Sequence, residues 1–270
     1  MVNDLHDFGL GADGLAPEFG DLLWDQKGDI YNTTFNGGTS GIGTVYELTP
    51  SGNGYTESVL YSFLGGADAS MPSSGLVWDS NGNLFGTSQY GGAYNWGTVF
   101  ELTYTVGVGW TDRVLYSFQN AGDGRIPAGG VIFDAAGNLY GTTADGGSGG
   151  GGTIFELSPS GNTWTYKLLY SFSGQYNNFC GPLATLTMDG AGNLYGTTYC
   201  DGLYSFGNVF KLSKTQNGWV YTSAYDFTRG PDGAGSAGYV SIDTGSTLYG
   251  TTVWRGDPDC GCGVVWMIKP

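Results

Sequence analysis

The sequence predicts an all-β fold, a five-bladed β-propeller with four antiparallel strands in each blade. Three observations indicate it: a short segment recurs five times in 270 residues, each copy has room for four short strands, and glycine-containing turns separate those strands. The 51 glycines follow no collagen-like period. Aromatic residues make up 15% of the chain, which is enough to bury a core. We therefore expect one folded domain over residues 1–270.

The recurring segment sets the length of the unit. Residues 137–143, with the sequence GNLYGTT, recur unchanged at 192–198, and variants occupy 28–34, 82–88 and 246–252. The aromatic residues at their centres lie 54 or 55 positions apart and are Tyr31, Phe85, Tyr140, Tyr195 and Tyr249. Five such units account for the whole chain, so we expect neither a linker nor a second domain. A β-solenoid is the alternative architecture.

Each unit divides into four expected strands, which we name A, B, C and D in chain order. In the second unit they cover 76–78, 83–88, 97–102 and 111–118. A tight turn containing Asn81 and Gly82 joins A to B, and a glycine-rich loop at 89–96 joins B to C. Sequential antiparallel strands of this length form the meander of a propeller blade.

The two ends of the chain predict how the ring closes. Residues 5–8 (LHDF) match the end of a D strand at 60–63 (LYSF), and the chain ends in a C strand at 263–268. The last blade therefore lacks a D strand, and the N-terminus supplies a spare one. We expect this N-terminal strand to complete the last blade, because closure removes an exposed sheet edge.

Two sets of aspartates recur along the chain. The first set closes strand A and consists of Asp25, Asp79, Asp134, Asp189 and Asp243. The second lies in the D-to-A loops and consists of Asp13, Asp68, Asp123 and Asp232. An aspartate beside a tight turn accepts hydrogen bonds from the turn amides, so we interpret both sets as turn residues. Calcium is the weaker alternative for the second set, and no other cofactor or metal is expected.

Charge and hydropathy exclude several partners. The 24 acidic and 9 basic residues give a formal net charge of −15, which argues against binding nucleic acid or an anionic membrane. No apolar run approaches about 18 residues, so we expect no membrane insertion. A charged start followed by an apolar stretch is also missing, so we expect no signal peptide within these residues. The oligomeric state is left open.

The four cysteines predict an oxidising compartment. Cys180 precedes strand A of the fourth unit and Cys200 follows its strand B. Those strand ends lie at the same end of an antiparallel pair, so we expect a Cys180–Cys200 disulfide. Cys260 and Cys262 form a C-G-C sequence in the last B-to-C loop and are either bonded to each other or reduced.

The candidate ligand-binding residues lie in the B-to-C loops, which emerge on the same face as the D-to-A loops. They are Asn36, Tyr90, Tyr94, Trp96, Asp145, Tyr199, Tyr204 and Trp254. Aromatic rings offer flat apolar platforms with polar edges, and acidic or amide side chains can bind hydroxyl groups. That combination suits a sugar ring. The alternative is that these aromatic rings only cover the ends of the blades.

Catalysis has weaker support than binding. Asp21, Glu18 and Asp201 are candidate carboxylates for glycoside hydrolysis, but the sequence does not give their separations. His6 is the only histidine and stands in the position of Tyr61, so we interpret it as a packing residue rather than a catalytic base. Regular repetition favours binding or scaffolding, because catalysis needs one asymmetric site. Whether the protein is an enzyme is left open.

The order of motifs in each unit resembles a known family. GNLYGTT is followed by GG, by GT[VI]FEL, by VLYSF and by DGxxP. This pattern resembles the GloVer tandem-repeat family of bacterial surface or secreted proteins with varied anchors, and it extends over essentially the whole chain. The resemblance implies export and a repeat scaffold, and it brings no catalytic residue. The five-fold layout is also similar to that of tachylectin-type lectins, which bind sugars at repeated sites.

Three functions therefore remain in order of preference. The first is a secreted or surface-exposed protein that binds carbohydrate or cell-surface glycan through the long-loop face. The second is a hydrolase or lyase acting on glycans, with carboxylates at the mouth of the channel. The third is a structural or adhesive surface repeat protein.

Overall fold

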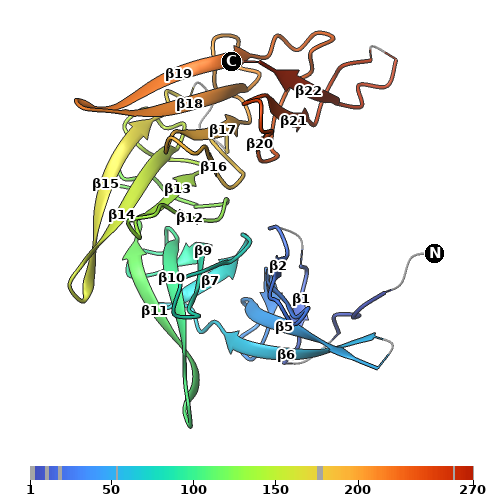
Figure 1. Cartoon of the computed structure of the whole chain (residues 1–270), viewed down its shortest axis with the longest axis vertical. Coiled ribbons are helices and arrows are strands. Elements are labelled where there is room, and N and C mark those ends of the chain that lie inside the picture. Colours follow the sequence, from blue (N-terminus) through green and yellow to red (C-terminus); the bar gives the residue numbers. More distant parts are fainter. Residues whose placement is uncertain are drawn as a thin grey trace. The chain divides into compact units, whose positions relative to one another are not determined.

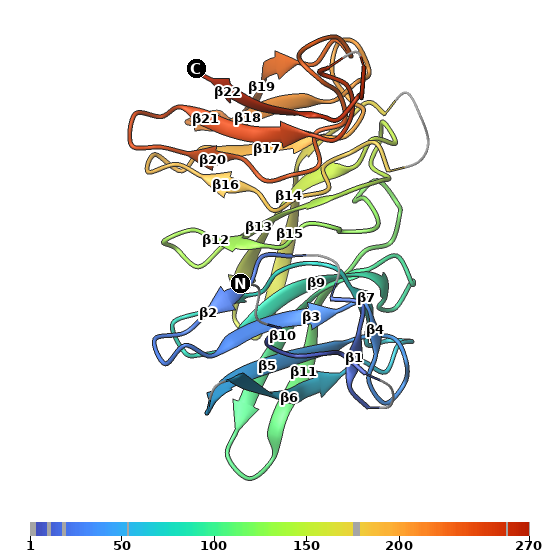
Figure 2. The ribbon, with the colours of Figure 1, turned by 90° about the vertical axis from the view of Figure 1, so that its right-hand side faces the viewer.

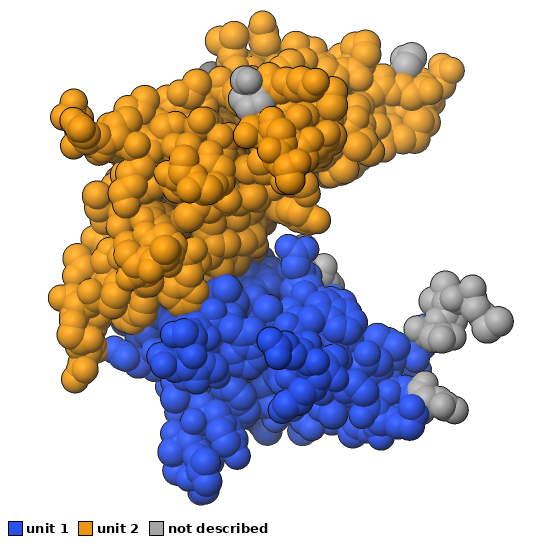
Figure 3. Space-filling model, viewed as in Figure 1, with its two compact units in different colours: residues 1–119 blue, residues 120–270 orange. Residues whose placement is uncertain are grey.

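The computed structural model describes residues 4–9, 12–17, 20–52, 54–174, 179–257 and 259–269. These residues form 22 strands and no helix (Figure 1). Within them, therefore, there is no apolar helix of the length that a bilayer requires. The chain groups into two compact units, residues 1–119 and 120–270 (Figure 3). That the whole chain is one domain stays a prediction, and each unit is described by itself.

Unit 1 contains two blade sheets. The first has the order β2 (Leu23–Trp24), β3 (Ile30–Thr34), β5 (Thr44–Ser51) and β6 (Gly54–Ser62). The second has the order β8 (Val77–Trp78), β9 (Leu84–Gly91), β10 (Thr98–Thr105) and β11 (Gly109–Ser117). Two short strands lie outside this order. β1 (Gly14–Leu15) pairs with β4 (Asn36–Gly37), and β7 (Ala69–Pro72) pairs with the C-terminal end of β9. The sheets thus follow the expected A-B-C-D order.

Unit 2 contains three further blade sheets, whose strands run alongside one another in Figure 2. One consists of β12 (Ile132–Phe133), β13 (Leu139–Thr143), β14 (Thr153–Ser160) and β15 (Thr163–Ser171). The next consists of β16 (Thr187–Met188), β17 (Leu194–Thr198), β18 (Asn208–Thr215) and β19 (Gly218–Asp226). The last consists of β20 (Ser241–Ile242), β21 (Leu248–Thr252) and β22 (Val264–Ile268). The predicted fold class is confirmed as a five-bladed β-propeller.

The glycine of the repeated segment makes room for an aromatic ring of strand C. An added Cβ would lie 2.5 Å from Phe155 Cζ at Gly141, and 2.5 Å from Phe210 Cζ at Gly196. Both phenylalanines are fully buried. The recurrence of this glycine therefore reflects packing inside the blade, where interiors are too dense to accept another methyl group.

The turn interpretation of the aspartates is confirmed. Asp134 Oδ1 accepts hydrogen bonds from the amides of Ala136 and Asn138, both at 2.9 Å, and the other four members of the first set repeat this geometry. Burial alone would raise the pKa of Asp134, but these bonds, together with those from the Asn138 side chain and Tyr140, hold that pKa below its ordinary value. In the second set, Asp68 accepts from two loop amides at 2.8 and 2.7 Å.

Closure of the ring by the N-terminal strand stays a prediction. The last blade sheet has three strands, and residues 4–9 form no strand. Phe8 instead packs against Tyr46 of β5, with ring centroids 4.9 Å apart, and His6 Nε2 lies 3.5 Å from Asp13 Oδ2. The segment therefore keeps its contacts with residues near it in sequence.

Candidate functional site

In each of the five repeats, the B-to-C loop pairs with the D-to-A loop at one equivalent position through backbone hydrogen bonds. The tied pairs are Leu15/Asn36, Ser70/Tyr90, Arg125/Asp145, Cys180/Cys200 and Ala234/Trp254. The backbone arrangement is shared, but the side-chain chemistry differs. Arg125 and Asp145 form an ion pair at 2.8 Å, whereas Cys180 and Cys200 form the expected disulfide. This position therefore holds the loops in place and leaves their tips to vary.

Three of the predicted ligand-binding residues belong to these tied pairs in the first three units. Asp145 is only 4% exposed, and its carboxylate is directed at Arg125. Asn36 and Tyr90 are half-buried and lie opposite Leu15 and Ser70. These three residues thus belong to the paired backbone segments that join the B-to-C loop to the D-to-A loop.

A pocket of about 500 Å³ in unit 2 brings two of the predicted residues together. Its lining consists of Tyr199, Cys200, Ser205, Phe206, Arg229, Ala234, Gly235, Trp254, Arg255, Cys260 and Gly261. The indole N–H of Trp254 donates a hydrogen bond to the Tyr199 hydroxyl at 2.6 Å. Because these residues come from the B-to-C loops of successive blades, the pocket depends on how neighbouring blades pack.

Backbone hydrogen bonds and a glycine shape the floor of the pocket. Gly235 N–H donates to Phe206 O at 2.9 Å, and Val253 N–H donates to Gly235 O at 3.0 Å. Gly235 has a φ of +67°, and a Cβ there would lie 2.9 Å from Trp254 Cδ1 and 3.0 Å from Tyr199 Cε2. A side chain at residue 235 would therefore displace the aromatic pair.

Disulfides hold two segments of the pocket wall. Cys200 is bonded to Cys180, and Cys260, whose state the sequence left open, is bonded to Cys262. Both Cys200 and Cys260 line the pocket. The loops that carry Tyr199 and Arg255 are therefore covalently restrained beside the residues that line the pocket.

The other predicted residues lie elsewhere. Tyr204 is exposed on the same loop as Tyr199 but does not line the pocket, while Tyr94 is exposed and Trp96 half-buried in unit 1. Asp201 is only 8% exposed and accepts a hydrogen bond from Ser173 Oγ at 3.1 Å. Asp21 is exposed in unit 1, and Glu18 lies outside the described residues. Among the residues that the structure describes, no carboxylate lines the pocket of unit 2.

Sequence reasoning missed a second aromatic pocket at the opposite strand ends, in unit 1. It has a volume of about 400 Å³, and its aromatic residues are Tyr31, Trp78, Tyr104 and Trp110. Trp78 and Trp110 have ring centroids 6.4 Å apart. The short A-to-B turns gave no reason to expect a pocket here. A usable signal was the pair of tryptophans at the ends of strand A and strand D of one unit.

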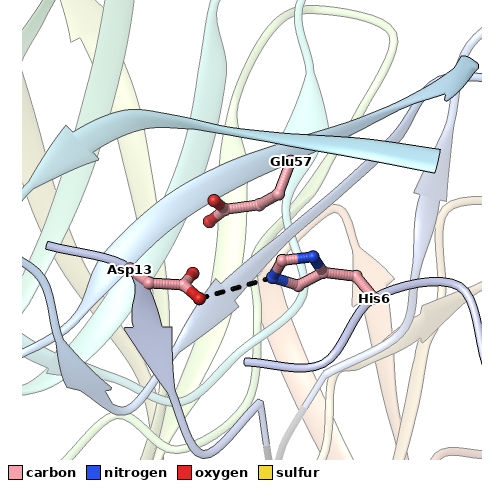
Figure 4. A group of neighbouring side chains, drawn as sticks. All are labelled: His6, Asp13 and Glu57. Atoms are coloured by element: carbon pink, nitrogen blue, oxygen red, sulfur yellow. Dashed lines mark ion pairs between the residues drawn. The ribbon is translucent and has the colours of Figure 1, made fainter. Parts of the chain in front are cut away.

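His6, Asp13 and Glu57 form a titratable cluster in unit 1 (Figure 4). Their potential ligand atoms all lie within 4.8 Å of one another, so this trio has the spacing of a metal site. Burial and a hydrogen bond with Asp13 raise the pKa of Glu57 to about 7. In the next repeat, also within unit 1, Asp68 and Asp112 form the equivalent carboxyl pair, and the Tyr61 hydroxyl takes the place of the imidazole. The repeated feature is thus a pair of neighbouring carboxyl groups in which one member, Glu57 or Asp112, has a raised pKa.

Solved structures with similar folds have low sequence identity to this chain. An ancestral GH74 enzyme has a TM-score of 0.57 and 15% identity, covering 95% of this chain and 34% of that one. A gluconolactonase from Xanthomonas campestris has a TM-score of 0.54 and 11% identity, covering 92% and 71%. A protein of unknown function from Dyadobacter fermentans has a TM-score of 0.54 and 12% identity, covering 92% and 77%. At these identities the likeness concerns the fold alone.

No curated protein matches the sequence. A family model does: the Gloeobacter/Verrucomicrobia repeat matches residues 16–266, which span all five blade sheets. This match agrees with the resemblance drawn from the repeated motifs. The chain therefore belongs to the Gloeobacter/Verrucomicrobia repeat family.

Proposed function

We propose that this protein binds a saccharide in the pocket of unit 2. The observation that carries the proposal is the hydrogen-bonded pair of Tyr199 and Trp254 above Gly235. Trp254 is 55% exposed, so its ring is available to a ligand. A pyranose ring presents a face of C–H groups that packs on such an aromatic surface.

The polar atoms of the pair supply the second half of sugar recognition. The Tyr199 hydroxyl accepts the hydrogen bond from Trp254, so its own proton is free to be donated to a sugar hydroxyl. The indole N–H holds the tyrosine in place. A few polar groups placed in a largely apolar pocket give orientation and specificity to small-molecule sites.

Binding is preferred over hydrolysis because none of the described residues that line this pocket is a carboxylate. Glycosidases of the common type need two carboxyl groups beside the scissile bond. Two proteins of similar fold, a GH74 enzyme and a gluconolactonase, lend general support to a ligand related to carbohydrate. Two disulfides support a secreted or surface-exposed location, because disulfides persist in oxidising compartments.

A glycan array followed by calorimetry tests the proposal. We expect selective binding, and we expect Trp254→Ala to weaken the affinity at least about tenfold, the loss of one stacked ring in a pocket. Trp96→Ala is the matched control, since Trp96 lies in the equivalent loop of unit 1 and outside the pocket. Equal affinity in Trp254→Ala and the unmodified protein would overturn the site.

A further inference from the structure

The pocket of unit 2 differs in charge from the rest of the chain. The protein has 24 acidic and 9 basic residues. The described lining of the pocket nevertheless contains two arginines, Arg229 and Arg255, and no acidic residue. A random patch on a surface of this composition would carry net negative charge. This local reversal of sign points to the charge of the ligand.

The two arginines are also distinct from the other two in the chain. Arg113 and Arg125 form ion pairs with Glu101 and Asp145. Within the described residues, neither Arg229 nor Arg255 has an acidic group within 4.0 Å of its side-chain nitrogens. The Arg229 guanidinium instead lies 5.2 Å from the centre of the Phe206 ring. Such a stacked guanidinium keeps its N–H edge free for a planar anion.

Both arginines have a backbone conformation in the left-handed region, which is unfavourable for a residue with a side chain. Arg229 has a φ of +65°. The equivalent positions that the structure describes in the other repeats hold Gly65, Asn120 and Gly174. Their φ values are +69°, +57° and +42°.

Arg255 repeats the pattern. Its φ is +69°, and three of the four equivalent positions hold glycine, namely Gly37, Gly91 and Gly146. A long side chain in the left-handed region is strained, and glycine is not. The fold therefore accepts arginine where its own repeat favours glycine, and both exceptions face one pocket.

From the charge, the free guanidinium groups and their strained positions, we propose that the ligand is an anionic saccharide. Arg229 and Arg255 receive its carboxylate or sulfate group, while Trp254 receives the face of a ring. This inference rests on the proposed saccharide binding and adds the chemical class of the sugar. Both arginine and an oxyanion group have planar or forked geometry that permits paired hydrogen bonds.

Matched glycan pairs test the charge directly. We would measure binding of oligogalacturonate against its methyl ester, and of sulfated galactan oligosaccharides against their desulfated form. We expect one charged member to bind at least about tenfold more tightly than its neutral partner, since hydrogen bonds to charged groups contribute most when desolvated. We also expect this preference to weaken as salt is added. The carboxylated and sulfated arms distinguish the two anions.

Variants at the arginines provide the second measurement. Arg229→Gly and Arg255→Gly place the residue of the other units in each position, so both variants should fold with an unchanged or higher melting temperature. We expect each to lose about tenfold in affinity for the charged glycan and to bind the neutral partner as before. Lys214→Gln, which removes a positive charge outside the pocket, is the control and should change nothing.

The outcomes separate the two proposals. Equal binding of charged and neutral partners, unaffected by the arginine variants, would overturn the anionic class and leave saccharide binding intact. Binding to neutral glycans alone on a broad array would do the same. A folded protein that binds no glycan on the array, charged or neutral, would overturn both.

Discussion

At the scale of single residues, two kinds of carboxyl group make the stability of the fold depend on pH in opposite directions. Turn aspartates such as Asp79 are held ionised: burial alone would raise the pKa, but hydrogen bonds from Asn83 and Asn81 lower it. Asp112 is the reverse case, because burial and the hydrogen bond with Asp68 raise its pKa to about 9. The same type of residue therefore stabilises the fold either as an anion or as an acid.

Asp112→Asn tests this difference. A folded state that binds the proton more tightly than the unfolded state loses stability as pH rises from the ordinary pKa toward about 9. Asparagine cannot ionise, so we expect the melting temperature of the variant to match that of the unmodified protein near pH 4 and to exceed it by several degrees near pH 9, since about 2–4 °C corresponds to 1 kcal/mol. A difference that stays constant with pH would contradict the assignment.

The control for this experiment is Asp79→Asn. The pKa of Asp79 is lowered, so its stabilising effect is present above the ordinary pKa and is lost as pH falls. We expect this variant to be less stable than the unmodified protein near neutral pH by about 1 kcal/mol, and the deficit to shrink in acid.

At the scale of elements, the B-to-C and D-to-A loops pair through the same backbone hydrogen bonding in different repeats, while the side chains that link them differ. The Cys180–Cys200 disulfide and the Arg125–Asp145 ion pair occupy equivalent positions of neighbouring units. Both pairs have inter-loop backbone hydrogen bonds of 2.8–3.3 Å. Equivalent backbone geometry implies that one chemistry can replace the other.

We therefore expect the double variant Arg125→Cys/Asp145→Cys to form a third disulfide. Residues in a hydrogen-bonded antiparallel pair have Cα atoms about 5.5 Å apart, within the range that a disulfide can span. Thiol titration of the unfolded, unreduced double variant should find no free thiol, while each single variant should show one. Two free thiols in the double variant would show that the loops differ in geometry.

At the scale of the whole molecule, repetition raises the question of cooperativity. The chain groups into residues 1–119 and 120–270, yet five units of one repeat compose it. In repeat proteins, stability comes from each unit and from its contacts with neighbours. We expect a single thermal transition whose calorimetric and van't Hoff enthalpies agree, as for one cooperative domain. Two resolved transitions would contradict the single-domain prediction.

Local periodicity was enough to predict the blades, the turn aspartates and the Cys180–Cys200 disulfide. Each depends on residues close in sequence, such as Asp134 and Asn138 four positions apart, and their local geometry repeats wherever the motif repeats. Ring closure by residues 5–8 depends on a partner strand almost a whole chain away, so local periodicity cannot establish it, and it stays a prediction.

The candidate site needed the folded chain. Tyr199 and Trp254 are 55 residues apart and were two aromatic residues among eight loop candidates until their hydrogen bond placed them together. Arg229 and Arg255 gave no signal in a sequence whose 24 acidic residues outnumber its 9 basic ones. Periodicity reveals what the units share, because shared residues serve the packing of each blade. A pocket is made where successive units differ, and only the packing of one blade on the next decides which of those differences meet.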